Sequence, residues 1–519
     1  MVKARRLTQS FFLLLFLFLF LQTEQKGVDT LGWPAKLFLD ADPLLFLATL
    51  ISGHAIVKAM LWSLVTLAAT VILGRVFCGW VCPLGTLNNL VGALRKRQAE
   101  VRTRRWFQVK YVLLVFLLGG SLFGMQLTGL FDPLSLLVRS LSLGAYPALN
   151  TAANGAMDAV YRVDTKLLTV PADIVYGALK KTLLAFQQPY FLQATLVTAL
   201  LVLILLLNLV ERRFWCRYLC PLGALLGLAG RWAMLRRQVA EGCNECGLCE
   251  RECQGGAAPE GARSWMASEC VYCMNCDDGC PKRKLSFGFS RNRSTEILDL
   301  GRRRMILAGG AGAAAVAVSR STPVFREGTP NPSLIRPPGA EPELRFLARC
   351  VKCGECMKVC TTNGLQPTLL EAGLEGLWSP MLVPRIGYCE FRCTLCGQVC
   401  PTGAIRKLNQ EEKAIVKIGT AMVDRGRCLP WAHATPCIVC EEMCPIPGKA
   451  IWYETVTQRT RAGQEVELKQ PRVDLEKCTG CGVCEAKCPV VDRPAIYVTS
   501  VGETRSKRNQ LLVESGGYG

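Results

Sequence analysis

The chain has 519 residues, including 28 cysteines but only two histidines, His54 and His433. Half of the residues are apolar and the formal net charge is +20, which favours a protein with membrane segments over a purely soluble one. No Cys-x-x-Cys-His sequence occurs, which excludes a c-type haem, and one histidine in the apolar half excludes a bis-histidine haem there. Tight Cys-x-x-Cys runs in so long a chain indicate metal or cluster ligation, not the disulfides of a small secreted protein.

Four apolar segments predict a bundle of four transmembrane helices. Residues 111–131 and 189–210 are uncharged and long enough to cross a hydrocarbon core of about 30 Å. Residues 55–77 carry basic side chains near their ends, which can reach the headgroups. Residues 11–21 form a shorter run after a basic N-terminus, and predict either an uncleaved first span or the apolar part of a signal peptide. No small-residue cleavage pattern follows, so we favour the span.

Basic residues between the second and third predicted spans set the expected orientation. By the positive-inside rule this loop faces the cytoplasm, and the loops at 24–54 and 132–188 face outward. The positive charge therefore indicates membrane topology and not nucleic-acid binding. The basic residues of the loop are Arg75, Arg95, Lys96, Arg97, Arg102, Arg104, Arg105 and Lys110.

A repeat lies within the apolar half. Cys78-Gly-Trp-Val-Cys82-Pro-Leu-Gly matches Cys216-Arg-Tyr-Leu-Cys220-Pro-Leu-Gly, which predicts two similarly oriented helical hairpins. Cysteines four residues apart share one helix face, and the repeat could bring both pairs together. The four thiols could ligate an additional centre, form redox-active dithiols or bind copper, or they could simply pack as small buried side chains.

The repeat also contains two Asp-Pro-Leu sequences, which begin at Asp42 and Asp132. Both are predicted at the outer ends of spans. They are candidate proton acceptors, and they could equally be the N-caps of helices that begin with proline.

Beyond residue 240 two four-cysteine motifs follow each other with the spacing of a two-cluster bacterial ferredoxin. In that arrangement three thiolates from one loop and the last cysteine of the other motif hold each [4Fe-4S] cluster. Structural zinc favours paired cysteines at larger separations. The predicted ligand sets are Cys243, Cys246, Cys249 and Cys280 for one cluster, and Cys253, Cys270, Cys273 and Cys276 for the other.

Four more motifs follow residue 340, two of them with a longer first gap, and short strands are expected to bracket the ligand loops. The same exchange of fourth ligands predicts four further clusters, six in all. Their ligand sets are Cys350, Cys353, Cys356 and Cys400; Cys360, Cys389, Cys393 and Cys396; Cys428, Cys437, Cys440 and Cys488; and Cys444, Cys478, Cys481 and Cys484.

Between the two ferredoxin-like parts lies an arginine-led apolar stretch, which begins at Arg302-Arg303-Arg304. It is similar to a twin-arginine export signal. The alternative is a basic anchor that precedes an ordinary short helix, which would have the same sequence pattern. If this stretch crosses a membrane as a possible fifth helix, residues 236–300 lie in the cytoplasm and residues 320–519 in the periplasm.

The fold class predicted from these segments is a membrane α-helical bundle joined to α+β ferredoxin-like domains. The expected domains are a membrane domain at residues 1–235, a two-cluster domain at 236–300, a linker at 301–341 and a four-cluster domain at 342–519.

The apolar repeat with its Cys-x-x-x-Cys-Pro motifs and the ferredoxin that follows resemble the NapH-type membrane polyferredoxins. The part from residue 300 looks like the NapG/MauM-type exported ferredoxins, so the chain resembles a fusion of two partners. The resemblance implies a quinol dehydrogenase component of the bacterial inner membrane, which draws on the quinone pool and passes electrons to a periplasmic reductase. The alternative is an assembly or regulatory factor whose membrane thiols reduce or deliver a metal such as copper.

Overall fold

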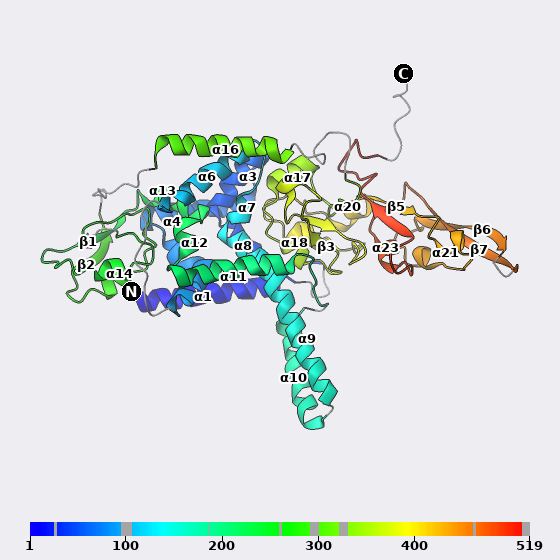
Figure 1. Cartoon of the computed structure of the whole chain (residues 1–519), viewed down its shortest axis with the longest axis horizontal. Helices are drawn as coiled ribbons and strands as arrows, with labels where there is room; N and C mark the ends of the chain where they lie inside the picture. The colour runs from blue at the N-terminus through cyan, green and yellow to red at the C-terminus, as the bar shows by residue number, and fades with distance from the viewer. Residues whose placement is uncertain are drawn as a thin grey trace, which may run out of the picture.

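The computed structural model describes residues 1–24, 29–94, 106–163, 165–185, 187–258, 262–290, 300–320, 331–459 and 463–510. Three parts follow one another along the long axis in Figure 1. A ferredoxin-like unit with β1 and β2 lies at one end, helices form the centre, and cysteine-rich units with β3 to β8 extend to the other end. A hairpin of two helices projects sideways from the centre.

The first 230 residues form the central helices, which we call the helical core together with the projecting hairpin α9 and α10. Their bounds are α1 (Val2–Gln22), α2 (Lys36–Asp40), α3 (Pro43–Gly53), η1 (Lys58–Trp62), α4 (Ser63–Leu73), η2 (Phe77–Val81), α5 (Pro83–Ala93), α6 (Phe107–Ser121), α7 (Thr128–Phe131), α8 (Pro133–Ser140), η4 (Leu141–Ala145), α9 (Tyr146–Val163), α10 (Lys166–Thr182), α11 (Ala194–Val210), α12 (Phe214–Tyr218) and α13 (Pro221–Gly230).

Proline starts the repeated helices of the core. α3, α8, α5 and α13 each begin at a proline, where the missing N–H costs nothing because the first turn has no intrahelical acceptor for it. In each repeat one of these prolines follows aspartate and the other follows cysteine. The repeat seen in the sequence is therefore a repeat of helix starts.

The prediction of four transmembrane helices is wrong. Among the described residues only α1 is both long and apolar enough to cross a membrane, and a signal sequence near an N-terminus meets the same criteria. The segments predicted at 55–77, 111–131 and 189–210 contain helices of 17 residues or fewer. Glycines with a positive φ follow two of these helices: Gly74 comes directly after α4, and Gly124 lies three residues after the end of α6. Composition alone does not reveal these helix ends. Most of the basic loop used for orientation, residues 95–105, lies outside the described residues.

The predicted fifth crossing is a 19-residue helix, α16 (Arg302–Arg320), which does not meet the criteria for a membrane span. It runs along α6 over the top of the core in Figure 1. A Cβ on Gly119 would lie 2.5 Å from the carbonyl oxygen of Gly309, and one on Gly312 would lie 2.1 Å from that of Phe116. Only glycine permits so close an approach of the two helices.

The cysteine-rich units contain short helices and small antiparallel sheets. The strands pair as β1 with β2, β3 with β4, β5 with β8, and β6 with β7. The bounds are β1 (Leu235–Val239), α14 (Leu248–Arg251), α15 (Asn275–Asp278), β2 (Leu285–Phe289), α17 (Glu343–Arg349), α18 (Glu355–Lys358), β3 (Leu365–Pro367), η6 (Leu374–Gly376), β4 (Pro380–Leu382), α19 (Leu395–Gln398), α20 (Gln410–Ile415), β5 (Thr420–Val423), α21 (Leu429–Ala432), α22 (Val439–Glu442), β6 (Ile451–Arg459), β7 (Glu465–Val473), α23 (Val483–Lys487) and β8 (Ile496–Thr499).

Strands bracket two of the three ferredoxin-like pairs of motifs. β1 and β2 pair on either side of residues 243–280, and β5 and β8 pair on either side of residues 428–488. Around residues 350–400 a single bridge between Ala340 and Ile405 takes that place. Each pair of motifs is therefore closed by contacts between its own flanks, which holds its two ligand loops against each other.

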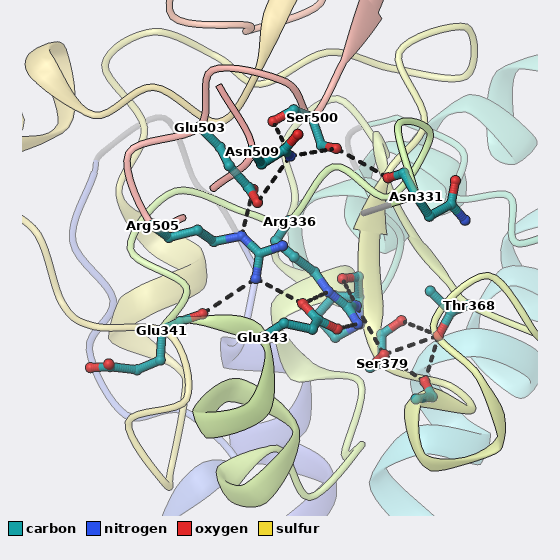
Figure 2. Close-up of polar contacts among 12 residues, drawn as sticks. Asn331, Arg336, Glu341, Glu343, Thr368, Ser379, Ser500, Glu503, Arg505 and Asn509 are labelled. Atoms are coloured by element: carbon teal, nitrogen blue, oxygen red, sulfur yellow. Dashed lines mark hydrogen bonds and ion pairs between the residues drawn. The ribbon is translucent and has the colours of Figure 1, made fainter. Parts of the chain in front are cut away.

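A buried polar network fastens the last residues described to the segment before α17, as Figure 2 shows. The carboxylate of Glu343 accepts hydrogen bonds from Arg336 Nη2 at 2.6 Å and from Arg505 Nη1 at 2.7 Å. Arg505 Nε also donates to Glu503 at 2.6 Å. Although burial favours the neutral carboxyl, the two guanidinium groups lower the pKa of Glu343 to about 2. The network therefore holds the C-terminal unit closed as an ionised pair at neutral pH.

Candidate iron-sulfur sites

All 28 cysteines are free thiols, so the structure contains no disulfide. Twenty-four of them lie in the cysteine-rich units, and the other four lie in the helical core. This distribution agrees with ligation and is incompatible with a disulfide framework.

In the N-terminal ferredoxin-like unit one of the two exchanged ligand sets comes together. The thiol of Cys270 lies close enough to Cys253, Cys273 and Cys276 for their charges to interact, and Cys253 is the last cysteine of the preceding motif. Cys249 packs in one apolar cluster with Cys243, Cys276 and Cys280, while Cys246 is exposed.

The first two motifs of the C-terminal part behave in the same way. The thiol of Cys356 interacts with Cys350 and Cys353 and, from the following motif, with Cys400 of its own predicted set and Cys396 of the other. The thiol of Cys396 interacts in turn with Cys389, Cys393 and Cys360. The structure thus brings together the two crossed sets expected from the sequence.

The last two motifs complete the pattern. Cys428 interacts with Cys437 and Cys488, and Cys440 interacts with Cys428 and Cys437. The thiol of Cys484 interacts with Cys444, Cys478 and Cys481 of the fourth predicted set, and also with Cys440 of the third.

The two motifs with longer first gaps keep their first cysteine in the set. After Cys428 the additional residues fold as the short helix α21, which has a proline in its first turn. The backbone N–H of Cys428 donates to the carbonyl oxygen of Asp424 at 3.0 Å, and Cys478 makes the same bond to Asp474. The lengthened loop therefore leaves the position of the first cysteine unchanged.

Backbone amides point at several of the sulfurs. Ala257 donates to Cys253 Sγ at 3.1 Å, and Ala421 donates to Cys478 Sγ at 3.4 Å. N–H groups that point at sulfur stabilise the anionic, ligating form of the thiol, and hydrogen bonds to cluster sulfurs adjust the reduction potential. The crossed sets and these donors fit [4Fe-4S] clusters.

Burial raises the pKa of the Cys356 and Cys484 thiols well above their usual range. Without a ligand such thiols remain protonated at neutral pH, because a buried thiolate is poorly solvated. In the described ranges no group of three or more His, Cys, Asp and Glu side chains is placed to hold a single metal ion.

The four remaining cysteines meet at the centre of the helical core. Cys78, Cys82 and Cys220 are buried and Cys216 is half-buried. Cys220 interacts electrostatically with the other three. The sequence suggested that the repeat could bring both pairs together, and the structure does so.

Asp42 and Asp132 are helix N-caps in the structure. Asp42 Oδ1 accepts the backbone N–H of Leu44 at 2.8 Å, and Asp132 Oδ2 accepts that of Ser135 at 2.8 Å. The two carboxyls are fully buried and face each other, and their other oxygens find no hydrogen-bond donor in the described part of the chain. Burial raises the pKa of both, most of all that of Asp42, so burial favours the protonated form of each carboxyl.

The loops of two cluster sets dock on the helical core in matching ways. Val271, between Cys270 and Cys273, packs its backbone carbonyl against Gly79. If Gly79 had a Cβ, that atom would lie only 2.0 Å from the carbonyl oxygen of Val271. The carbonyl of Val351, between Cys350 and Cys353, would be 1.9 Å from a Cβ on Gly129. Arg139 Nη1 donates to the carbonyls of both Gly129 and Lys352, at 3.1 and 3.0 Å.

Sequence reasoning missed the charged residues that support these contacts. Glu269 is 1% exposed, forms ion pairs with Lys110 and Arg75, and accepts a hydrogen bond from Tyr111 at 2.8 Å. It immediately precedes Cys270. The available signal was an arginine three residues before each Cys-x-x-x-Cys-Pro motif, Arg75 and Arg213.

Comparison with known proteins agrees with this chemistry. A family described as "4Fe-4S binding domain" matches residues 57–101 and 192–239, which contain the two repeats of the core, and a second family of the same description matches residues 471–491. No solved structure matches the chain.

Three curated relatives cover different shares of the chain. The methylamine utilization ferredoxin-type protein MauM of Methylorubrum extorquens is 38% identical over 28% of this chain, which spans 63% of that relative. The ferredoxin-type protein NapG of Escherichia coli is 35% identical over 34% of this chain and 77% of NapG. The regulatory protein NosR of Pseudomonas aeruginosa is 30% identical over 48% of this chain but only 28% of NosR.

These matches, together with the ligand sets, establish [4Fe-4S] binding and iron-sulfur electron transfer as the chemistry of the chain. The chain is 35% identical to NapG over 77% of the length of NapG, and it is also similar to MauM. It therefore belongs to the family of NapG- and MauM-type ferredoxins.

Proposed function

We propose that this protein oxidises quinol at the bacterial inner membrane and passes the electrons to a periplasmic reductase. The observation that carries the proposal is the matched docking of two ferredoxin-like loops, at Gly79 and at Gly129, on a helical core between them. Such an arrangement suits a protein that receives electrons at one place and delivers them at another. When bound, a [4Fe-4S] cluster takes up and releases one electron at a time.

The membrane part of the proposal relies on α1, whose length and composition suit a membrane span. The compartments predicted for residues 236–300 and 320–519 stay predictions. So do the twin-arginine role of α16 and the proposed fusion with a NapH-type partner.

A cavity of about 490 Å³ beside α1 and α5 offers a place for the quinol head. This volume lies within the range of roughly 300–1,000 Å³ that is usual for small-ligand sites. Its lining includes the amides of Gln9, Asn88 and Asn89, which can hydrogen-bond hydroxyl groups, and the apolar side chains of Leu13 and Leu90. Asn88 Nδ2 also lies 3.6 Å from Cys216 Sγ, so the cavity adjoins the thiols of the core.

Oxidation of quinol to quinone releases two protons with its two electrons. We propose Asp42 and Asp132 as a proton-holding pair in this protein, because the Asp42 Oδ2 and Asp132 Oδ1 atoms lack donors and the two acids share one buried site. Their capping bonds use the other oxygen of each carboxyl. Capping and proton holding are therefore compatible.

The test is reduction of anaerobically purified full-length protein by duroquinol, followed by EPR of the iron-sulfur signals. We expect saturable reduction. Asn89→Leu should raise the KM for duroquinol about tenfold, the loss of roughly one hydrogen bond. Asn154→Leu on the projecting α9 is the matched control and should leave the KM unchanged. If dithionite reduces the protein but duroquinol does not, quinol is not the donor.

A second candidate, an assembly or regulatory factor that reduces or delivers a metal, is favoured by one observation. Four thiols gather in the core outside every ferredoxin set, and one relative is named a regulatory protein. Serine at Cys78, Cys82, Cys216 and Cys220 separates the two candidates. If electron flow from quinol to the reductase survives while a metalloenzyme of the host remains unmatured, this second function replaces the first.

A further inference from the structure

The two Cys-x-x-x-Cys-Pro repeats build one site. All six pairs among Cys78, Cys82, Cys216 and Cys220 interact electrostatically. The backbone N–H of Gly223 donates to Cys220 Sγ at 3.2 Å. Each repeat supplies only two cysteines, so neither forms a four-thiol site alone.

Each repeat also supplies an arginine that crosses to the other one. Arg213 Nη1 donates to the carbonyl oxygen of Cys78 at 3.0 Å. In the opposite direction, Arg75 reaches Gly223 of the second repeat. A Cβ on Gly223 would lie 2.8 Å from Arg75 Nη2 and 3.4 Å from Cys220 Sγ. The two guanidinium groups thus occupy equivalent places in a two-fold arrangement around the thiols.

Both arginines are 1% exposed, and Arg75 Nε and Arg213 Nε and Nη2 find no acceptor among the residues that the structure describes. Buried donors without acceptors cost free energy, and those of a cation favour an anion nearby. Glu269 is shared between Arg75 and Lys110. Arg213 interacts with a further buried cation, Arg5, so positive charge exceeds negative charge beside the thiols.

We propose that the four cysteines hold one further [4Fe-4S] cluster, shared by the two repeats and flanked by Arg75 and Arg213. On ligation the four thiols lose their protons and form four iron–sulfur bonds. A [4Fe-4S]²⁺ core with four thiolates carries a charge of −2, which is opposite in sign to the two guanidinium groups that flank the site. A single copper or zinc ion is disfavoured, because no group of three or more ligands in the described residues is placed to hold one.

The position of this site gives it a role. Cys78, Cys82 and Cys220 belong to the same buried apolar cluster as Cys273 on one side and Cys353 on the other. Trp80, between the two cysteines of the first repeat, donates a hydrogen bond to the backbone of the neighbouring ferredoxin loop at 2.8 Å. The site therefore lies between the two ferredoxin-like units, as a link between them. This inference is independent of the electron donor and does not require quinol.

The experiment compares iron and acid-labile sulfide per chain, with Mössbauer spectra, in wild-type protein and in the variant with serine at all four positions. We expect the variant to lose about four irons and four sulfides and to retain the EPR signals of the ferredoxin-like units. Unchanged iron and sulfide would overturn the proposal. A Cys78–Cys82 or Cys216–Cys220 disulfide in anaerobically isolated wild-type protein would also overturn it.

A second variant covers the case in which the four substitutions prevent folding. Arg213→Gln should keep the wild-type iron content and lower the reduction potential of one cluster, because a nearby positive charge favours the reduced state. Arg212→Gln, which removes a partly exposed arginine that pairs with Glu252, is the matched control and should leave every potential unchanged. Identical redox titrations of the two variants would contradict the assignment.

Discussion

The indole Nε1 of Trp80 donates a 2.8 Å hydrogen bond to the backbone carbonyl of Tyr272. Trp80 lies in the first Cys-x-x-x-Cys motif of the helical core, and Tyr272 lies between two cysteines of the N-terminal ferredoxin-like unit. Residues almost 200 positions apart in the sequence are thus fastened at the point where cysteines of both units converge. The following predictions test this junction and its counterparts.

Gly79→Ala should loosen the docking of the N-terminal ferredoxin-like unit. A Cβ would lie 2.0 Å from the backbone oxygen of Val271, so the loop must shift, at a cost of about 1–3 kcal/mol in the free energy of unfolding. Thermal unfolding followed by visible absorbance measures the change. Gly155→Ala, where a Cβ meets nothing within 4 Å, should unfold at the wild-type temperature or slightly above. Equal effects of the two substitutions would contradict this account of the contact.

Gly129→Ala should act on the other docking site. Its Cβ would lie 1.9 Å from the backbone oxygen of Val351, and Arg139 could then no longer reach both carbonyls that it now binds. We expect the cluster set at Cys350 to lose iron faster than wild type during anaerobic incubation with a chelator. The set at Cys270 should lose iron at the wild-type rate.

Glu269→Gln should destabilise the protein more than Lys110→Met. The first change leaves Arg75 and Lys110 buried without their anion, and removal of one partner of a buried ion pair costs about 3–5 kcal/mol. The second leaves Arg75 to balance Glu269 at 3.6 Å. Urea unfolding of the two variants measures the difference. The reverse order would show that Lys110, and not Glu269, is the group on which the cluster of charges depends.

Glu343→Gln should lower stability at neutral pH but not in strong acid. Burial alone would raise the pKa of Glu343, but Arg336 and Arg505 lower it to about 2 from an ordinary value of 4.5. A lowered carboxyl pKa stabilises the folded state above the unfolded-state pKa, and this contribution disappears as the pH falls from about 4.5 to about 2.

The measurement for Glu343→Gln is the difference in urea midpoint between variant and wild type at several pH values. Acid damage to clusters affects both proteins, so the difference isolates the carboxyl. Glu465→Gln, in an exposed pair with Arg459, should change the midpoint little at any pH, because exposed pairs contribute about 0–1 kcal/mol. A difference between Glu343→Gln and wild type that persists at pH of about 2 would exclude the proposed ionised network.

The exchange of fourth ligands can be tested by iron counting. Cys350→Ser with Cys400→Ser removes two ligands from one crossed set and should cost about four irons. Cys350→Ser with Cys360→Ser removes one ligand from each of two sets and should perturb two clusters. If the second pair of substitutions affects only one cluster, each motif keeps its own four cysteines.

The sequence predicts which cysteines share a cluster, because four-iron ligation constrains spacing within a few residues and the Cys-Pro endings mark each motif. It also related the two core repeats and suggested both possible uses of Asp42 and Asp132. It misjudged the apolar segments. Their composition resembles membrane spans, but the helices within the predicted spans 55–77 and 111–131 end at Leu73 and Ser121, and hydropathy does not register where a helix ends.

The sequence by itself determined the chemistry of this protein, since the identity and local spacing of thiols set which cofactor they can hold. Only the tertiary structure decided which distant groups meet. It placed Arg75 and Arg213 across from each other's repeats, brought four thiols of the core into one site, and set that site between Cys273 and Cys353. These contacts join residues more than 100 positions apart through close backbone packing at glycines and through buried charges, and no local sequence pattern predicts either of them.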